Sequence, residues 1–353
     1  MKSRNLILSY IAASLFSAGV MANADKNALT LSSQPIPLTT AVSPEFYEFS
    51  KNFPAANVEA LQENLPKTES EWRSVVESRD KAAIERAKFI AHTLEVTIEK
   101  ASIAVVDVYW VTPKTVAPEL KDKLFVAIQG GAYMLNSGLA SAAEASIIAA
   151  KMQIPVIAID YTKSIDAPAP AARNDIITVW NELLKNHSAE SIVMGGSSAG
   201  GSLTLAVTQE LNKQALPIPS ALYVGTPSVD MTMTGDSRYI NEGLDHILGA
   251  WRGMSSAMVD VYVGDLELSD PVVSVINGSF NNFPPTYLIT GTRDLLLSDT
   301  VRVHRELRRA GVAAELNVYE GQSHGDYAAA FGTPESNEHY QALSEFLYGH
   351  LVK

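Results

Sequence analysis

Short apolar runs alternate along the chain with longer segments in which apolar residues recur every three or four positions. The short runs predict eight strands, at residues 94–98, 103–111, 124–128, 156–159, 191–194, 221–224, 286–289 and 315–319. The longer segments predict helices at residues 142–151, 172–185, 200–214, 300–310 and 335–351. Because strands and helices alternate, the pattern indicates an α/β fold with a mainly parallel eight-stranded sheet and helices on both faces.

The segments outside this alternation of strands and helices predict a lead-in and a cap. Residues 25–44 are polar and proline-rich, and Glu71–Phe89 has helical periodicity. We therefore expect residues 25–92 to form a lead-in and a helical cap segment, and residues 93–353 to form the domain that holds the sheet. Residues 237–263 fit no strand–helix unit and are expected to be a cap insertion near the carboxyl ends of the strands.

The first residues, 1–24, are typical of a secretory signal peptide. Lys2 and Arg4 precede the uncharged apolar run Leu6–Met21, and Ala22-Asn23-Ala24 fits a cleavage site. The apolar run is shorter than the ~20 residues that a membrane-spanning helix needs. We expect cleavage, no stable membrane anchor afterwards, and a periplasmic or secreted protein.

Charge and cysteine content narrow the possible functions. A net charge of −12 argues against binding to DNA or RNA, because such binding depends on neutralising phosphates. The absence of cysteine excludes disulfides, thiolate metal ligands and a thiol nucleophile. The sequence has no metal-ligand spacing and no dinucleotide-type glycine pattern, so we expect neither a metal nor a cofactor. It carries no signal for an oligomeric state.

One serine lies in a pattern typical of a nucleophile. Ser198 follows a predicted strand, precedes a predicted helix, and is flanked by Gly196 and Gly200. A tight strand–turn–helix exposes the hydroxyl at the helix N-terminus, where backbone N–H groups favour developing negative charge. Ser197 cannot occupy the central position, because Ala199 stands where the second glycine is required.

A serine nucleophile needs a base and an acid that orients the base. His324 lies between the last strand and the last helix and is the predicted base. The predicted acid is Asp294, just after the strand at 286–289; the alternative, Asp299, instead caps the helix from Thr300. The other histidines after Ser198 are expected on solvated helix faces, or in one case in the cap insertion where it could line a pocket: His304, His339 and His350, and His246.

An oxyanion hole requires backbone donors. We expect one donor to be the N–H of Ala199, and the others to come from Gly130, Gly131 and Ala132, after the strand at 124–128. Tyr133 is expected to border the substrate pocket, and Ser197 is a further candidate substrate-binding residue beside the nucleophile.

These residues together resemble the bacterial hormone-sensitive lipase-like esterases of the α/β-hydrolase fold. Further similar segments are Asp160-Tyr161 with Asp166–Ala172, and Tyr262–Pro271; the resemblance covers Val105 to the C-terminus. The resemblance implies hydrolysis of carboxylic esters without a cofactor, under a small helical cap built partly from the N-terminal helices.

Three positions depart from the family pattern. The family's His-Gly-Gly-Gly is Gln129-Gly130-Gly131-Ala132 here, Ser197 replaces an aspartate, and Leu295 replaces a proline after Asp294. The Gln129 amide could organise the loop as the family's histidine does. The Ala132 methyl group would narrow the acyl pocket or shift the loop, which favours a narrower range of substrates.

The residues predict acyl transfer to water through an acyl-enzyme. The expected substrates are small-molecule carboxylic esters with short to medium acyl groups, or lactones. An amidase or peptidase with the same triad remains an alternative, as does a non-catalytic ligand-binding protein on a hydrolase scaffold.

Overall fold

A computed structural model describes residues 35–63 and 65–352 of the 353-residue chain. Leu38–Lys353 form one compact unit, and residues 35–37 belong to a separate unit and have no regular secondary structure. The predicted signal peptide lies outside the described residues. No helix among the described residues is long and apolar enough to cross a membrane.

The centre of the compact unit is an eight-stranded sheet with the order β1-β2-β4-β3-β5-β6-β7-β8. β2 pairs antiparallel with both β1 and β4, and all other neighbouring strands are parallel. The strands are β1 (Thr97–Ile103), β2 (Val106–Thr112), β3 (Leu124–Ile128), β4 (Val156–Ile159), β5 (Ile192–Ser197), β6 (Leu222–Gly225), β7 (Thr286–Gly291) and β8 (Ala314–Tyr319). The predicted mainly parallel eight-stranded sheet is confirmed.

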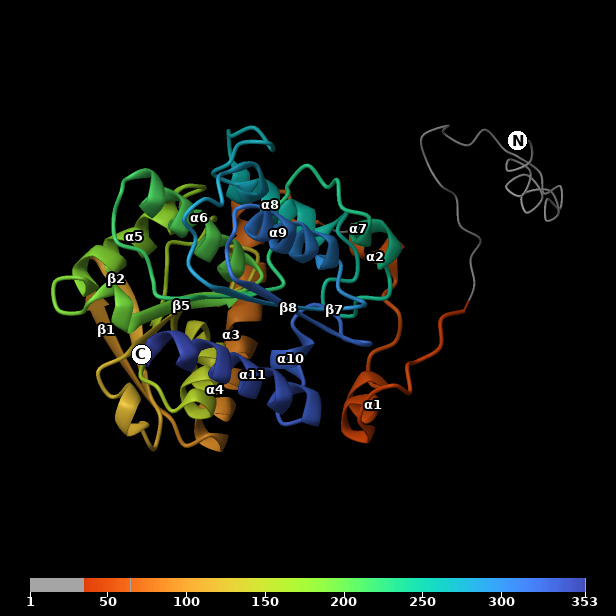
Figure 1. Ribbon diagram of the computed structural model, residues 1–353. Coiled ribbons are helices and arrows are strands. Elements are labelled where there is room, and N and C mark those ends of the chain that lie inside the picture. Colours follow the sequence, from red (N-terminus) through yellow and green to blue (C-terminus); the bar gives the residue numbers. More distant parts are fainter. Residues whose placement is uncertain (1–34, 64, 353) are drawn as a thin grey trace, which may run out of the picture. The chain divides into compact units, whose positions relative to one another are not determined.

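Helices cover both faces of the sheet (Figure 1). They are α1 (Pro44–Ser50), α2 (Val58–Gln62), α3 (Glu69–Thr93), α4 (Ala142–Met152), α5 (Ala171–Leu183), α6 (Ala199–Lys213), α7 (Ser237–Ile240), α8 (Met254–Val263), α9 (Leu297–Arg309), α10 (Asp326–Ala329) and α11 (Pro334–Leu351). α5, α6 and α9 pack on one face, and α3, α4 and α11 pack on the other.

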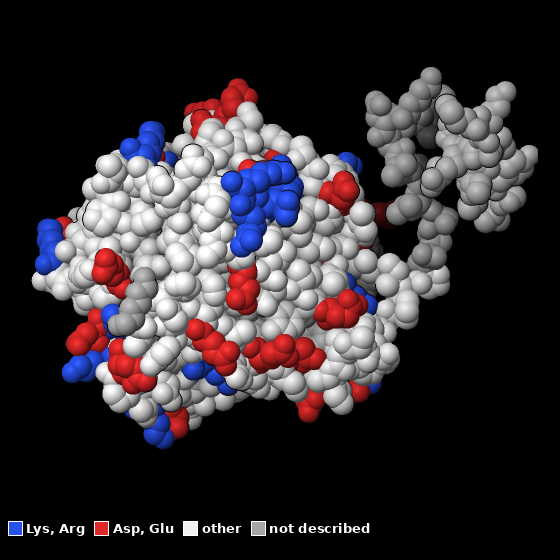
Figure 2. All heavy atoms as spheres, in the orientation of Figure 1, with Lys and Arg blue, Asp and Glu red and all other residues white. Residues whose placement is uncertain are grey.

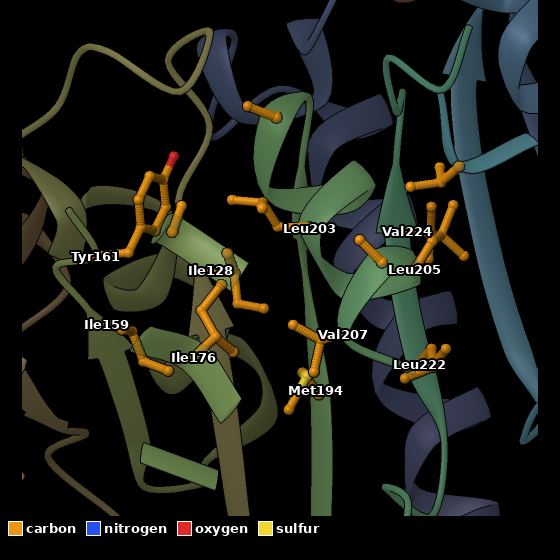
Figure 3. Close-up of a cluster of buried hydrophobic side chains, with 14 of the residues drawn as sticks. Ile128, Ile159, Tyr161, Ile176, Met194, Leu203, Leu205, Val207, Leu222 and Val224 are labelled. Carbon is orange, nitrogen blue, oxygen red and sulfur yellow. The ribbon is translucent and has the colours of Figure 1, made fainter. Parts of the chain in front are cut away.

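The core between the sheet and α6 follows from the helical period. Leu203 and Val207 lie one turn apart on the same side of α6 and meet strand side chains such as Met194 (Figure 3). All three are fully buried. The central strands are apolar at successive positions because both of their faces are covered.

α3 begins with a capping box and belongs to the segment that was expected to be helical. The Thr68 hydroxyl accepts from the Glu71 N–H, and the Glu71 carboxylate accepts from the Thr68 N–H at 3.0 Å. α3 packs against α4 and the short turn Gly138–Ser141. This packing places α3 beside the loop that follows β3.

The first hairpin and the position of His339 differ from the sequence-based expectations. β1 runs to Ile103, where the second strand was expected to begin, and the chain reverses at Ala104, which has φ of 52°. His339 was expected at the surface but is fully buried, and its Nδ1 lies 3.3 Å from the Tyr287 hydroxyl. Burial lowers the pKa of His339 to about 3. Periodicity does not reveal this burial because the residues around it come from other elements.

The charged surface agrees with the acidic composition. On the face in Figure 2, acidic side chains are scattered, whereas one basic patch lies over α9. The exposed arginines of that helix are Arg305, Arg308 and Arg309. His304 on α9 is half-buried rather than fully solvated.

Candidate active site

Ser198 occupies a sharp turn between β5 and α6. Its backbone has φ of 58°, a left-handed conformation that is uncommon for a residue with a side chain. A Cβ at Gly196 or Gly200 would lie 1.8 or 1.9 Å from the carbonyl oxygen of Ile128. Both glycines are therefore required by the approach of β3 to the turn, which explains the spacing seen in the sequence.

Ser198 lines a cavity of about 500 Å³. His324, Thr226 and the loop Gln129–Ala132 line the same cavity. The remaining wall is largely apolar and includes side chains from α2, α3 and the segment 247–258, namely Leu61, Ala83, Ile90, Ile247, Leu248, Met254 and Met258. The cavity therefore combines polar side chains, including Arg79 and Arg86 of α3, with a largely apolar wall, as is common for small-molecule sites.

His324 and Asp294 form a buried pair. Nδ1 of His324 lies 3.1 Å from Oδ1 of Asp294. Asp294 is fully buried and also accepts hydrogen bonds from the Thr290 hydroxyl at 2.8 Å, the Leu296 N–H at 2.8 Å and the Thr226 hydroxyl. The sequence-predicted base and acid are thus side by side, with the base facing the cavity that Ser198 also faces.

Opposing effects set the charges of this pair. Burial alone would raise the pKa of Asp294, but the adjacent His324 and the hydrogen bonds hold it below its usual value. Burial alone would lower the pKa of His324, but Asp294, Asp245 and Asp326 raise it above its usual value. The surroundings therefore favour an ionised Asp294 and stabilise a protonated imidazole.

Asp245 is a functional candidate that the sequence analysis missed. It is fully buried, and its carboxylate accepts from the N–H of His324 at 3.4 Å and from the N–H of Leu295 at 2.9 Å. Burial and the nearby Asp294 raise the pKa of Asp245 to about 6. One carboxylate thus ties together the two loops that carry the base and the acid.

The loop after β3 presents backbone donors to the cavity. Gly131 has φ of 117° and Ala132 has φ of 51°. Within the described part of the chain, the N–H groups of Gly130, Gly131, Ala132 and Ala199 donate to no other protein group. Unpaired N–H groups at a cavity wall are suited to a developing oxyanion.

The two predicted substrate-binding residues have different environments. Tyr133 is buried in the core, where its ring stacks on Tyr262 at 3.6 Å between centroids, so it does not line the cavity as expected. The Ser197 hydroxyl borders the cavity, but it donates to Oε1 of Glu144 at 2.6 Å and accepts from the Tyr327 hydroxyl at 2.8 Å. Glu144, another residue that the sequence did not indicate, also lines the cavity.

The alternative acid and the cap histidine lie outside the cavity wall. Asp299 is buried in the first turn of α9 and pairs with Arg238 at 2.6 Å; it does not cap the helix, which begins at Leu297. His246 lies between Ser323, 2.9 Å from its Nδ1, and Asp326, 3.0 Å from its Nε2, and its ring stacks on Phe53. No group of His, Asp or Glu side chains among the described residues could hold a metal ion.

Comparison with protein families places this geometry among known hydrolases. Residues 125–328 match the family described as having the alpha/beta hydrolase fold. An esterase from Acinetobacter venetianus is 28% identical over 225 residues, which cover 64% of this chain and 74% of the relative. A putative acetyl-hydrolase, LipR, from Mycobacterium tuberculosis is 26% identical, over 72% of this chain and 80% of the relative.

Solved structures of esterases also superimpose on this chain. The crystal structure of esterase E25 superimposes with a TM-score of 0.90 at 44% identity, and the match covers 92% of this chain and all (100%) of E25. An esterase from the bacterial hormone-sensitive lipase family superimposes with a TM-score of 0.73 over 88% of this chain and 100% of that one; at 23% identity this similarity supports the fold alone.

Proposed function

Because the chain belongs to the α/β-hydrolase family, in its hormone-sensitive lipase-like branch, and is a carboxylic-ester hydrolase, we propose that it works through a Ser198–His324–Asp294 triad and an acyl-enzyme. Ser198 attacks the ester carbonyl carbon while His324 takes the hydroxyl proton. The resulting oxyanion accepts hydrogen bonds from the N–H of Ala199 and of the Gly130–Ala132 loop.

Collapse of this intermediate breaks the ester bond, and His324 gives its proton to the leaving alcohol. A water molecule, deprotonated by His324, then attacks the acyl-enzyme and releases the acid, and the proton returns to Ser198. Asp294 holds the imidazole in the tautomer whose Nε2 can accept a proton, and its charge stabilises the imidazolium. Such general acid–base help contributes roughly 10²–10⁴-fold to the rate.

The observation that carries the proposal is the buried contact of 3.1 Å between His324 Nδ1 and Asp294 Oδ1, at a cavity that Ser198 also lines. The cavity of about 500 Å³ suits small esters with short to medium acyl groups, or lactones. We further propose that the protein is periplasmic or secreted; this rests on the signal-like residues 1–24.

Hydrolysis of p-nitrophenyl esters of increasing acyl length tests the triad. We expect the mature protein to favour short to medium chains, and Ser198→Ala to lower kcat by a factor on the order of 10⁶. Ser269→Ala, at the exposed surface, is the control for this loss, and we expect it to keep the wild-type turnover. Full activity of Ser198→Ala would exclude Ser198 as the nucleophile. Faster cleavage of matched amides than of esters would instead favour an amidase.

A further inference from the structure

In the loop after β3, each unpaired N–H group shares a peptide plane with a carbonyl group. The hydrogen bond that holds this carbonyl also fixes the direction of the N–H. In a trans peptide, the C=O of one residue and the N–H of the next point in opposite directions. The Gln129–Gly130 and Gly130–Gly131 peptides are both trans. A side chain that holds the carbonyl therefore also sets where the N–H points.

Asn136 holds the second of these peptides. Its Nδ2 donates to the carbonyl oxygen of Gly130 at 3.0 Å. The N–H of Gly131, in the same peptide, must then point away from the Asn136 amide. Asn136 itself has φ of 66°, a conformation that asparagine tolerates better than most residues with side chains.

Tyr161 holds the first peptide. Its hydroxyl donates to the carbonyl oxygen of Gln129 at 3.0 Å, and the whole side chain is buried. The N–H of Gly130 must then point away from Tyr161. The side chain of Gln129 points away from these two peptides. Its carboxamide fits between the carbonyl oxygen of Ile159 and the amine of Lys163, which lies 2.9 Å from the carboxamide oxygen.

Both clamping residues are themselves anchored. Asp80 of α3 accepts from the N–H of Asn136 at 2.7 Å and from that of Ser137 at 3.2 Å. Lys163 lies over the ring of Tyr161, 4.4 Å from its centroid, and donates to Oδ1 of Asp160 at 2.7 Å. Oδ2 of Asp160 accepts from the N–H of Gly138 at 2.8 Å. The loop is therefore fixed at both ends before any substrate arrives.

We propose that Asn136 and Tyr161 are the positioning residues of the oxyanion hole, which they set by holding the carbonyls of Gly130 and Gln129. The proposal rests on the proposed ester hydrolysis at Ser198. Neither residue forms a bond with the reacting atoms. Their effect is to keep two N–H groups aligned with the tetrahedral oxygen, so their loss should weaken binding of the transition state more than binding of the substrate.

Asn136→Gly and Tyr161→Phe test whether these side chains position the oxyanion hole rather than bind the substrate. Glycine keeps the positive φ of position 136 but removes the amide, and phenylalanine removes only the hydroxyl. Because loss of one oxyanion donor costs about 10²–10³-fold, we expect misalignment to lower kcat for p-nitrophenyl butyrate by roughly 10- to 100-fold, with KM changed less than about threefold.

A trifluoromethyl ketone provides the second readout. Ser198 Oγ adds to its carbonyl carbon, the serine proton goes to His324, and the oxygen becomes an oxyanion in the hole. We expect its inhibition constant to rise by the same factor as kcat/KM falls in each variant. The corresponding unfluorinated ketone, which scarcely forms the adduct, should bind equally well to all variants. A merely structural change would alter binding of both ketones.

Two matched controls accompany these variants. Asn282→Gly changes another asparagine of positive φ, 58°, in an exposed loop, and Tyr262→Phe changes another buried tyrosine. Both should retain the wild-type kcat. Unchanged kcat and ketone inhibition in folded Asn136→Gly and Tyr161→Phe would overturn the inference, while Ser198→Ala remained inactive. Wild-type activity in Ser198→Ala would overturn the proposed function and the inference with it.

Discussion

The oxyanion loop and the surroundings of His324 are held in place by different chemistry. On one side, the groups that contact the oxyanion peptides are neutral: the Asn136 amide and the Tyr161 hydroxyl, whose pKa burial raises far above its usual value. On the other side, the groups around His324 are the carboxylates of Asp294, Asp245 and Asp326. We infer that the pH dependence of catalysis comes chiefly from the second side, because on the first side the charged groups Asp80, Asp160 and Lys163 lie behind the neutral groups that contact the oxyanion peptides.

After Ser198→Ala, the largest effect on kcat is expected from Asp294→Asn. The variant loses the charge that stabilises the imidazolium and favours the wrong imidazole tautomer, so kcat should fall about 10⁴-fold. The measurement is steady-state hydrolysis of p-nitrophenyl butyrate, with the exposed Asp265→Asn as the control that keeps full activity. A loss of less than about tenfold would mean that Asp245 can supply the charge instead.

The second largest effect is expected on the free energy of unfolding, when Arg238, the partner of Asp299, is replaced. Asp299 and Arg238 form a fully buried ion pair, and the guanidinium also lies 3.7 Å from the ring centroid of Trp251. Arg238→Met leaves the buried Asp299 carboxylate without its charged partner and with only the Val229 N–H at 2.9 Å, so urea unfolding should show a loss of about 3–5 kcal/mol.

Because burial already raises the pKa of Asp299, removal of Arg238 raises it further. The folded variant then binds a proton more readily than the unfolded chain, and its stability deficit should shrink as the pH falls. Arg238→Met combined with Asp299→Leu should recover most of the loss. The pH profile of kcat/KM should match the wild type in both variants; a shifted profile would place Asp299 in the catalytic machinery.

The smallest effect is expected from Asp245→Asn, on the pH dependence of kcat/KM. This variant compares the carboxylates around His324 with the neutral groups at the oxyanion peptides. Protonated His324 cannot accept the Ser198 proton, so kcat/KM should rise with pH through the pKa of His324, which lies above its usual value. Asp245→Asn removes one negative neighbour and should move this limb to lower pH, by up to about one unit.

Asn136→Gly should lower kcat/KM at every pH and leave the limb in place. The check is a pH series of kcat/KM for the wild type and the two variants under the same conditions. The rise of kcat/KM with pH could stay in place in Asp245→Asn, or it could shift in Asn136→Gly. Either result would contradict the distinction between the carboxylates around His324 and the neutral groups that hold the oxyanion peptides.

Local features of this chain could be predicted from the sequence, whereas contacts between distant segments could not. β3 and β4 lie at the predicted residues, because short apolar runs between turn residues are a local signal. The first strand boundary was misplaced, because apolar residues continue across the hairpin at Ala104. Ser198 stood out because tight turns need glycines at fixed positions, and the close approach of Ile128 to Gly196 and Gly200 gives the reason.

Asp245, Asn136 and Glu144 carried no such signal. Asp245 is 79 residues from His324 along the chain, and Glu144 is 53 residues from Ser197. An aspartate or a glutamate in such a segment is equally compatible with a solvated surface. Tyr133 and His339 were misassigned for the same reason, because their burial depends on the partners Tyr262 and Tyr287 from distant elements.

The sequence by itself determined the α/β architecture, the turn at Ser198 and the membership of Asp294 and His324 in loops at one edge of the sheet. These depend on the period of apolar residues and on short-range steric limits, which neighbouring residues set. Only the tertiary structure decided which way the oxyanion peptides point and which carboxylates surround His324. Hydrogen bonds and charges act over a few ångströms in space, so they depend on how distant segments pack together.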